Sequence, residues 1–251
     1  MAPHPQYTRL PLPEQHTLLR RVIARCTSKA GSPTPVVVFD LDGTLMDNRP
    51  RTCTILREFA ETLGKDDAAL ADRLRTISPD GLSYLLTDSL VRLGIERSDL
   101  VARAEEFWRE RFFADEHLRH DVEVAGAVRF ARACYDVGAT LVYMTGRDLP
   151  LMGIGSFRSL RDLGFPIGVP GTELVLKPDA SMPDEAYKRF EGPKLARVGK
   201  VVAIFDNEPA NCNVLLALYP EADSVFIDTQ HLPGAPPLDP RVHVIADFRL
   251  A

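Results

Sequence analysis

The chain has 251 residues, enough to bury a sizeable hydrophobic core, and this length indicates one large domain or one domain that carries a substantial insertion. Apolar residues make up 45% of it and charged residues 26%, as in soluble globular proteins, which excludes a disordered chain, a collagen-like fibre and a disulfide-held miniprotein. The formal net charge of −5 at pH 7 argues against bulk binding of nucleic acid.

Three local features bear on location. No apolar run approaches the roughly 20 residues of a membrane span, so no membrane association is expected. The four cysteines lie far apart with no C-x-x-C pair, which indicates a reducing compartment and neither a zinc ribbon nor a redox motif. The start, Met1–Pro5, lacks the layout of a secretory signal, so a cytoplasmic location is expected. Nothing in the sequence defines an oligomeric state.

The first 35 residues form a proline-rich, basic arm, with five basic residues against one acidic residue. An amphipathic stretch from Glu14 to Lys29 predicts a basic helix within it. Because the arm runs directly into the first expected strand, an arm docked on the folded core is the favoured interpretation, and a targeting segment is the alternative.

From Val36 onward, short runs rich in β-branched and aromatic residues alternate with helical patterns. The expected strands are 36–39, 140–144, 173–176, 201–205, 224–227 and 242–245. This alternation predicts a doubly wound, Rossmann-like α/β fold, in which helices cover both faces of a parallel sheet.

One stretch breaks the alternation, because it contains no convincing strand and repeated signals for helix starts and stops. We therefore expect residues 48–120 to form a helical insertion, and residues 1–47 and 121–251 to form the core domain. Within the insertion, apolar residues at three- and four-residue spacing predict a helix that begins near Ser98. Its residue Trp108 is interpreted as packing for the insertion, with stacking on a substrate as the alternative.

The strongest local signal is the run VVVFDLDGTL, in which an apolar strand ends in Asp40 and Asp42 and a glycine follows. Ligands of open α/β sheets bind at the carboxyl ends of the strands, so both carboxylates are expected to face one ligand. One would attack and the other would handle protons. An Asx-type turn that caps the strand is the structural alternative. A D-x-D-G-T run arises by chance in only about one of a few hundred chains of this length, which favours function.

This signature resembles that of the haloacid dehalogenase (HAD) superfamily, and the resemblance covers roughly residues 36 to 228. It implies the HAD fold with an inserted helical cap. In that family the first aspartate, here Asp40, attacks phosphorus to form an aspartyl-phosphate. The second, here Asp42, protonates the leaving group and then activates water. A carboxylate needs its charge neutralised to attack a phosphate dianion, so a Mg²⁺ ion is expected beside Asp40.

Thr145, Gly146 and Arg147 follow the next expected strand and look like the second motif of the family. A hydroxyl and free backbone amides at a strand end suit phosphate oxygens. Thr145 is therefore predicted to be catalytic, and Gly146 and Arg147, with Gly43 and Thr44 of the first motif, are predicted to bind substrate. For Arg147, an ion pair with the insertion is the alternative. A threonine cap for the following helix is the structural alternative.

The third motif of the family is a lysine or arginine that offsets the charge of nucleophile and phosphate, and Lys177, Lys188 and Lys194 are candidates. Lys188 lies one turn into an expected helix, 18 residues before the next acidic strand end. This arrangement resembles HAD phosphatases of the polynucleotide kinase-phosphatase type. Lys188 is therefore predicted to be the catalytic lysine, and the other two stay open.

The fourth motif looks like Asp206, which ends another apolar strand. The resemblance implies that Mg²⁺ is held by Asp40, the backbone carbonyl of Asp42, Asp206 and water. Asn207 and Asn211 stand where many members of the family have an aspartate, and are expected to hold metal-bound water by hydrogen bonds. A helix-capping role for Asn207 is the alternative.

The predicted function is thus a Mg²⁺-dependent phosphatase that hydrolyses a phosphate monoester through an aspartyl-phosphate. Family members that cleave other bonds generally lack the second aspartate, so Asp42 favours phosphate esters. A phosphotransferase or phosphomutase with the same site is the first alternative, and a non-catalytic phosphate-binding regulatory protein is the second. A cap that excludes water suits a small phosphorylated metabolite as substrate.

Overall fold

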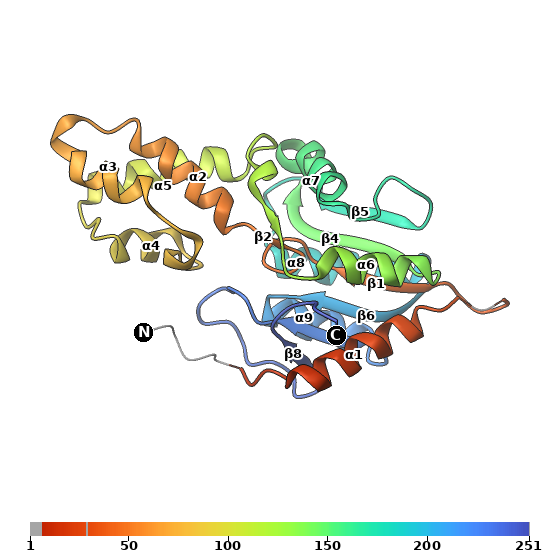
Figure 1. Ribbon diagram of the computed structural model, residues 1–251. Coiled ribbons are helices and arrows are strands. Elements are labelled where there is room, and N and C mark those ends of the chain that lie inside the picture. Colours follow the sequence, from red (N-terminus) through yellow and green to blue (C-terminus); the bar gives the residue numbers. More distant parts are fainter. Residues whose placement is uncertain (1–6, 29, 251) are drawn as a thin grey trace.

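A parallel sheet of six strands forms the centre of the molecule in a computed structural model, which describes residues 7–28 and 30–250 (Figure 1). The strands are β1 (Pro35–Phe39), β4 (Thr140–Asp148), β5 (Thr172–Lys177), β6 (Lys200–Asp206), β7 (Asp223–Ile227) and β8 (His243–Ile245). Their order is β5-β4-β1-β6-β7-β8, and every neighbouring pair is parallel. The doubly wound α/β fold and all six predicted strands are confirmed.

The central strand β1 is buried on both faces, which explains its continuous apolar sequence. Successive side chains of a strand point to opposite faces, so Val37 and Phe39 enter one hydrophobic cluster and Val36 and Val38 enter another. The chain leaves β1 between β4 on one side and β6 on the other. This is the switch point at which open α/β sheets bind their ligands.

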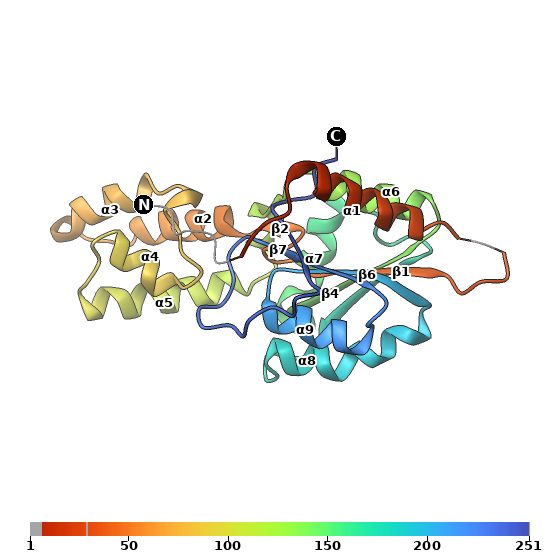
Figure 2. The ribbon, with the colours of Figure 1, turned by 90° about the horizontal axis from the view of Figure 1, so that it is seen from below.

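Helices cover both faces of this sheet. Figure 2 shows α1 (Leu12–Arg25) and α6 (Ala127–Asp136) on one face, and α8 (Asp184–Glu191) and α9 (Pro209–Leu218) on the other. A further helix, α7 (Leu149–Leu163), adds Leu160 to the cluster beneath α1 and α6. None of the helices in the described ranges is long and apolar enough to span a bilayer.

The predicted basic helix of the N-terminal arm is α1. It begins two residues before Glu14, because prolines favour the first turn of a helix, and it ends at Arg25. Lys29, the predicted end of the helix, lies outside the described residues. Its apolar residues Leu18, Leu19 and Val22 are buried in the core. On its basic side, Arg21 and Arg25 each lie 2.6 Å from a carboxylate oxygen of Asp223 on β7. The arm is therefore docked on the sheet by both its faces.

Residues 49 to 120 lie to one side of the sheet, beyond the carboxyl end of β1 (Figure 1). The helices are α2 (Arg49–Ala60), α3 (Ala68–Arg75), α4 (Leu86–Arg92) and α5 (Ser98–Phe112), with 3-10 turns at Lys65–Asp67, Pro79–Gly81 and Leu118–His120. The helix predicted near Ser98 is confirmed as α5, and these helices share a hydrophobic cluster of their own. We call residues 48–120 the insertion; its boundaries as a domain stay a prediction.

A two-stranded antiparallel ribbon joins the two connections between the core and the insertion. It pairs β2 (Met46–Asp47) with β3 (Val122–Glu123). This ribbon could not be predicted from the sequence, because two-residue strands carry no periodic pattern. The ribbon brings the start of α2 close to the chain that returns from the insertion, and both reach the carboxyl end of β1.

Candidate active site

Asp40 and Asp206 lie side by side at the carboxyl ends of adjacent strands. β1 and β6 are paired with Phe39 opposite Phe205, so the residue after each comes to the same edge of the sheet. Lys188 of α8 lies between the two carboxylates: its Nζ is 2.8 Å from Asp40 Oδ1 and 2.6 Å from Asp206 Oδ2. The sequence placed these three residues far apart, and the fold brings them together.

The cluster is almost inaccessible to solvent, with the Lys188 side chain only 1% exposed. Burial raises the pKa of Asp40 to about 7; Lys188 opposes this shift and Asp206 adds to it. Burial would lower the pKa of Lys188, but the two carboxylates outweigh it and hold that pKa above its usual range. The lysine therefore stays charged beside the predicted nucleophile.

The other two candidate lysines bind elsewhere. Lys177 Nζ lies 2.8 Å from Asp184 Oδ1 and 3.0 Å from the carbonyl oxygen of Met182. Lys194 Nζ lies 2.6 Å from Glu191 Oε1 at the surface. Of the three lysines, only Lys188 contacts Asp40.

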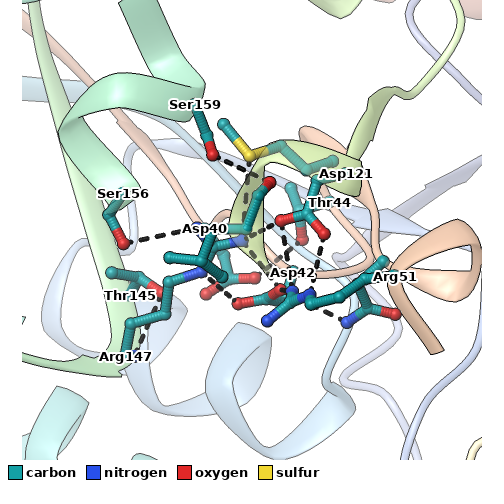
Figure 3. Close-up of polar contacts among 12 residues, drawn as sticks. Asp40, Asp42, Thr44, Arg51, Asp121, Thr145, Arg147, Ser156 and Ser159 are labelled. Atoms are coloured by element: carbon teal, nitrogen blue, oxygen red, sulfur yellow. Dashed lines mark hydrogen bonds and ion pairs between the residues drawn. The ribbon is translucent and has the colours of Figure 1, made fainter. Parts of the chain in front are cut away.

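Asp42 is held by two arginines (Figure 3). Arg147 donates from Nε to Oδ2 at 2.7 Å and from Nη2 to Oδ1 at 2.9 Å, and Arg51 donates from Nη2 to Oδ1 at 2.6 Å. Asn48 adds a fourth hydrogen bond at 3.2 Å. Burial would raise the pKa of Asp42, but the guanidinium groups of Arg147 and Arg51 hold it well below its usual range.

A second aspartate, Asp121, completes this network. Arg51 donates to it from Nε at 2.8 Å and from Nη2 at 3.2 Å, and Arg147 donates from Nη2 at 2.7 Å. The side chains of Arg51, Arg147 and Asp121 are at most 1% exposed. Two buried arginines thus face two aspartates, Asp42 and Asp121, and their charges balance. We call these four residues the charge network.

Arg51 and Asp121 are functional residues that the sequence did not predict. Arg51 lies in the first turn of α2, and Asp121 lies just before β3, so both are near the ends of the insertion, where polar residues are usually solvated. They are 70 residues apart, and no local spacing links them.

The turn of the first motif depends on Gly43 and Thr44. Gly43 has φ +75°, and a side chain there would collide with the amide of Asn207. Thr44, which was predicted to bind substrate, is fully buried beneath Asp40. Its Oγ1 lies 3.1 Å from Asp40 Oδ2 and 3.2 Å from Asn207 Oδ1. Thr44 therefore orients the carboxylate, because a hydroxyl in this position has no access to a ligand.

The second motif forms the end of β4, which continues to Asp148. Thr145 is 1% exposed, and its Oγ1 accepts a hydrogen bond from the backbone nitrogen of Arg147 at 3.2 Å. A side chain on Gly146 would collide with the carboxylate of Asp184. The side chain of Asp148, and not Thr145, caps α7 by accepting from Leu151 N at 3.0 Å, so the capping alternative for Thr145 is wrong.

Asn207 and Asn211 bond to protein groups around Asp206. Asn211 Nδ2 donates to Asp206 Oδ1 at 3.2 Å, and the backbone nitrogen of Glu208 donates to the same oxygen at 2.9 Å. Asn207 Nδ2 donates to the carbonyl oxygen of Gln230 at 2.6 Å. Glu208 stands at the N-cap of α9, so the capping alternative for Asn207 is also wrong.

The donor set at the strand ends is made of oxygen atoms, which fits Mg²⁺. Asp40 and Asp206 offer carboxylates close enough to share one ammonium group, and the chain passes Asp42 at the same edge. Within residues 7–28 and 30–250, no group of three His, Cys, Asp or Glu side chains is placed to hold a metal. An ion bound here would therefore complete its shell with backbone carbonyl, water and phosphate oxygens, as Mg²⁺ commonly does.

A cavity of about 1240 Å³ separates the strand ends from the insertion. It is lined from the core by most of the predicted site residues, and from the insertion by α2, α5 and the loop before α4. The predicted residues that line it are Asp40, Asp42, Gly43, Thr145, Gly146, Arg147, Asn207 and Asn211.

No family model matches the sequence, and no curated protein matches it. Solved structures do. A candidate phosphatase from Clostridium difficile has a TM-score of 0.52 at 16% identity, over 83% of this chain and 93% of that one. Protein tyrosine kinase A from Mycobacterium tuberculosis also scores 0.52 at 16% identity, over 86% and 95%. A candidate haloacid dehalogenase-like hydrolase from Burkholderia xenovorans LB400 scores 0.49 at 15% identity, over 85% and 93%.

At these identities the likeness shows the fold and not the reaction. The chain is a doubly wound α/β protein, as its sequence predicted, and it shares its fold with the first two of these structures.

Proposed function

We propose that this protein is a Mg²⁺-dependent phosphatase that hydrolyses phosphate monoesters through an aspartyl-phosphate on Asp40. The observation that carries the proposal is the buried contact of Lys188 with Asp40 and Asp206, beside Asp42 at the switch point of the sheet. A buried lysine that stays charged between two carboxylates offsets negative charge where a phosphate dianion must approach a carboxylate.

The first half-reaction transfers the phosphoryl group. A carboxylate oxygen of Asp40 forms a bond to phosphorus while the ester P–O bond breaks, and the leaving oxygen takes a proton from Asp42. Thr44 and Lys188 fix the orientation of the attacking carboxylate through the contacts at 3.1 and 2.8 Å. Thr145 and Gly146 line the cavity at the end of β4, where the oxygens of the transferred phosphate would lie. Asp40, Asp206 and the backbone carbonyl of Asp42 would hold Mg²⁺, which would neutralise negative charge on the phosphoryl group.

The second half-reaction restores Asp40. The carboxylate of Asp42 takes a proton from water, the water oxygen bonds to phosphorus, and the bond from phosphorus to Asp40 breaks to release phosphate. Arg51 and Arg147 hold Asp42 ionised, which is the state that this step needs. The first step needs a proton on Asp42, so a phosphate group that attracts Arg147 would favour it by weakening that ion pair.

A small or medium phosphorylated metabolite is the substrate class that we propose. The cavity of about 1240 Å³ lies between the core and the insertion, and it is large enough to hold such a molecule against Asp40. A phosphotransferase or phosphomutase would use the same residues and differ only in the acceptor. Assays with and without sugar or alcohol acceptors, in which free phosphate and phosphorylated acceptor are both quantified, separate hydrolysis from transfer.

The direct test is Asp40→Asn, which is nearly isosteric but removes the nucleophile. Phosphate release from a panel of monoesters with Mg²⁺ should fall by ~10³-fold or more, while the thermal unfolding curve shows that the variant is folded. Asp80→Asn, at a side chain that is 96% exposed on the insertion, is the matched control and should keep full activity. Near wild-type release from folded Asp40→Asn would end the aspartyl-phosphate proposal.

A further inference from the structure

Three aromatic side chains at the end of α5 lie together on one wall of the cavity. Trp108 and Phe112 are stacked with ring centroids 4.3 Å apart, and Phe113 meets them edge-on at 5.8 and 5.1 Å. All three line the same cavity as Asp40 and Asp42. Phe113 remains 41% exposed, and the other two are half-buried. We call these three residues the aromatic shelf.

The shelf is fixed in place from α2. Trp108 Nε1 lies 3.2 Å from Thr52 Oγ1, and the guanidinium of Arg51 lies 4.1 Å from the centroid of Phe112. Arg51 also donates to the carbonyl oxygen of Phe112 at 2.8 Å. A surface that is already ordered loses little conformational entropy when a ligand covers it, so the shelf is suited to binding.

Arg51 sets the position of the aromatic shelf relative to the predicted catalytic aspartates. The guanidinium that lies over Phe112 also donates to Asp42 at 2.6 Å, so a single planar group separates the shelf from the predicted proton donor. Asp42 must reach the oxygen that leaves phosphorus. The organic group attached to that oxygen is therefore placed next to the shelf.

Other apolar side chains face the same space. Tyr84 and Leu85, in the loop before α4, are 43% and 38% exposed, and Leu151 on α7 is 54% exposed. All three line the cavity. Exposed apolar groups gathered in one concave site mark a place that an apolar ligand covers.

The charges in the cavity exclude one kind of ligand. Among the described residues that line it, ten are acidic and five are basic. Four of the basic side chains are paired with acidic side chains of the same lining: Arg9 with Asp228, Arg49 with Asp47, Arg147 with Asp42 and Lys177 with Asp184. Lys188 and Arg249 also neutralise two of the lining carboxylates, Asp40 and Asp247. The remaining lining carboxylates still outnumber the remaining cation, Arg109; they are Glu105, Glu123, Asp148 and Glu208. A second anionic group on the substrate would thus meet more carboxylates than cations.

We propose that the aromatic shelf binds the organic part of the substrate, and that the substrates are phosphate monoesters of aromatic alcohols without a second anionic group. This inference rests on the proposed function, because it takes the phosphoryl group to lie at Asp40. An aromatic ring of the substrate gains affinity by stacking on the shelf, and a polyhydroxy leaving group does not.

Trp108 is the only tryptophan of the chain, so its fluorescence reports on the shelf directly. We would titrate the Asp40→Asn variant, which does not turn over, with phenyl phosphate, glycerol 2-phosphate and 4-carboxyphenyl phosphate in the presence of Mg²⁺. Phenyl phosphate should change the emission saturably. Glycerol 2-phosphate should bind at least tenfold more weakly because it has no ring, and 4-carboxyphenyl phosphate should do so because of its additional negative charge.

The variant that tests the shelf is Phe113→Ala, which removes an exposed ring and leaves the reporter in place. It should weaken phenyl phosphate binding about tenfold in the Asp40→Asn background, and Phe113→Tyr should restore it. With Asp40 intact, Phe113→Ala should raise KM for phenyl phosphate and leave that for glycerol 2-phosphate unchanged. Phe190→Ala is the control, because Phe190 is 62% exposed and outside the cavity lining.

Two results would overturn the inference in different ways. If the active enzyme hydrolyses phosphate esters but phenyl and glycerol phosphates bind equally, or Phe113→Ala changes nothing, the shelf is not the substrate site and the proposed function stands. If no monoester is bound or hydrolysed with Mg²⁺, the proposed function fails and the inference fails with it.

Discussion

The charge network predicts a specific pattern of stability losses. Arg51 and Arg147 face Asp42 and Asp121, with two positive and two negative charges; Asp42 is 28% exposed at the cavity, and the other three side chains are at most 1% exposed. Asp121→Asn would leave two guanidinium groups with one carboxylate between them. Arg51→Met would leave two carboxylates with one guanidinium group. Either single change should cost about 3 kcal/mol, because it leaves an uncompensated charge buried.

The double variant Arg51→Met with Asp121→Asn removes one charge of each sign, and leaves Arg147 paired with Asp42. Its loss of stability should therefore fall short of the sum of the single losses by about 2 kcal/mol or more. Urea titrations followed by circular dichroism give the free energies of unfolding. In thermal unfolding, each single variant should melt about 6–12 °C lower, since roughly 2–4 °C corresponds to 1 kcal/mol in a chain of this size.

A matched control is the ion pair of Arg75 and Glu61, 2.9 Å apart on the surface of the insertion. Both side chains are exposed, so solvent screens their attraction, and Arg75→Met should leave the unfolding midpoint unchanged. Additive losses in the double variant, or single losses as small as that of the surface pair, would refute the view that the four groups form one balanced network.

Three further outcomes are expected at the site. Lys188→Met should lower kcat by ~10²-fold or more, because a charge in a desolvated site stabilises the transition state. The same change at the surface residue Lys194 should have little effect on kcat, and the rate of phosphate release measures both variants. EDTA should abolish activity, and Asp206→Ala should raise the Mg²⁺ concentration for half-maximal rate at least tenfold; a chelated enzyme at full rate would contradict the metal assignment. Gly43→Ala should destabilise the protein more than Gly31→Ala in unfolding assays, because φ is positive at both positions but only Gly43 would also clash with a neighbour.

The sheet and its acidic strand ends could be predicted because their signals are local. Each strand is a short apolar run, and a parallel sheet brings all carboxyl ends to one edge. The proximity of Asp40 and Asp206 could therefore be predicted without knowing any contact between distant parts of the chain. Lys188 was harder, since three lysines had the right charge, and only the packing of α8 decides which one meets Asp40.

Two members of the charge network, Arg51 and Asp121, could not be predicted, because they look like ordinary surface residues in the sequence. Arg51 follows a proline in the first turn of α2, and Asp121 precedes a strand of two residues. Their burial follows from the ribbon of β2 and β3, which has too few residues to leave a periodic pattern. A charged residue with its partner far along the chain is recognised only when the tertiary structure is known.

The small polar residues of the site show a different limit of prediction from sequence, which concerns their hydrogen-bond partners. Thr44 and Asn207 were assigned contacts with phosphate and metal-bound water from their residue types and positions. In the structure the hydroxyl of Thr44 lies within hydrogen-bond distance of two acceptors, Asp40 Oδ2 and Asn207 Oδ1, and the amide nitrogen of Asn207 donates to the carbonyl of Gln230. Residue type gives the capacity to donate or accept, but the partner depends on which loop packs nearby, here the one after β7.

Arg51 links the insertion to the predicted catalytic residues of the core. It belongs to α2, yet it contacts Asp42 and Asp121 and holds Phe112 of the aromatic shelf. Arg147 and Asp42 belong to the core, so any rotation of the insertion about the β2–β3 ribbon would carry Arg51 away from them. Such a rotation would break a buried ion pair and also move the shelf. The position of the insertion, the ionisation of Asp42 and the place of the leaving group are therefore coupled through one guanidinium group.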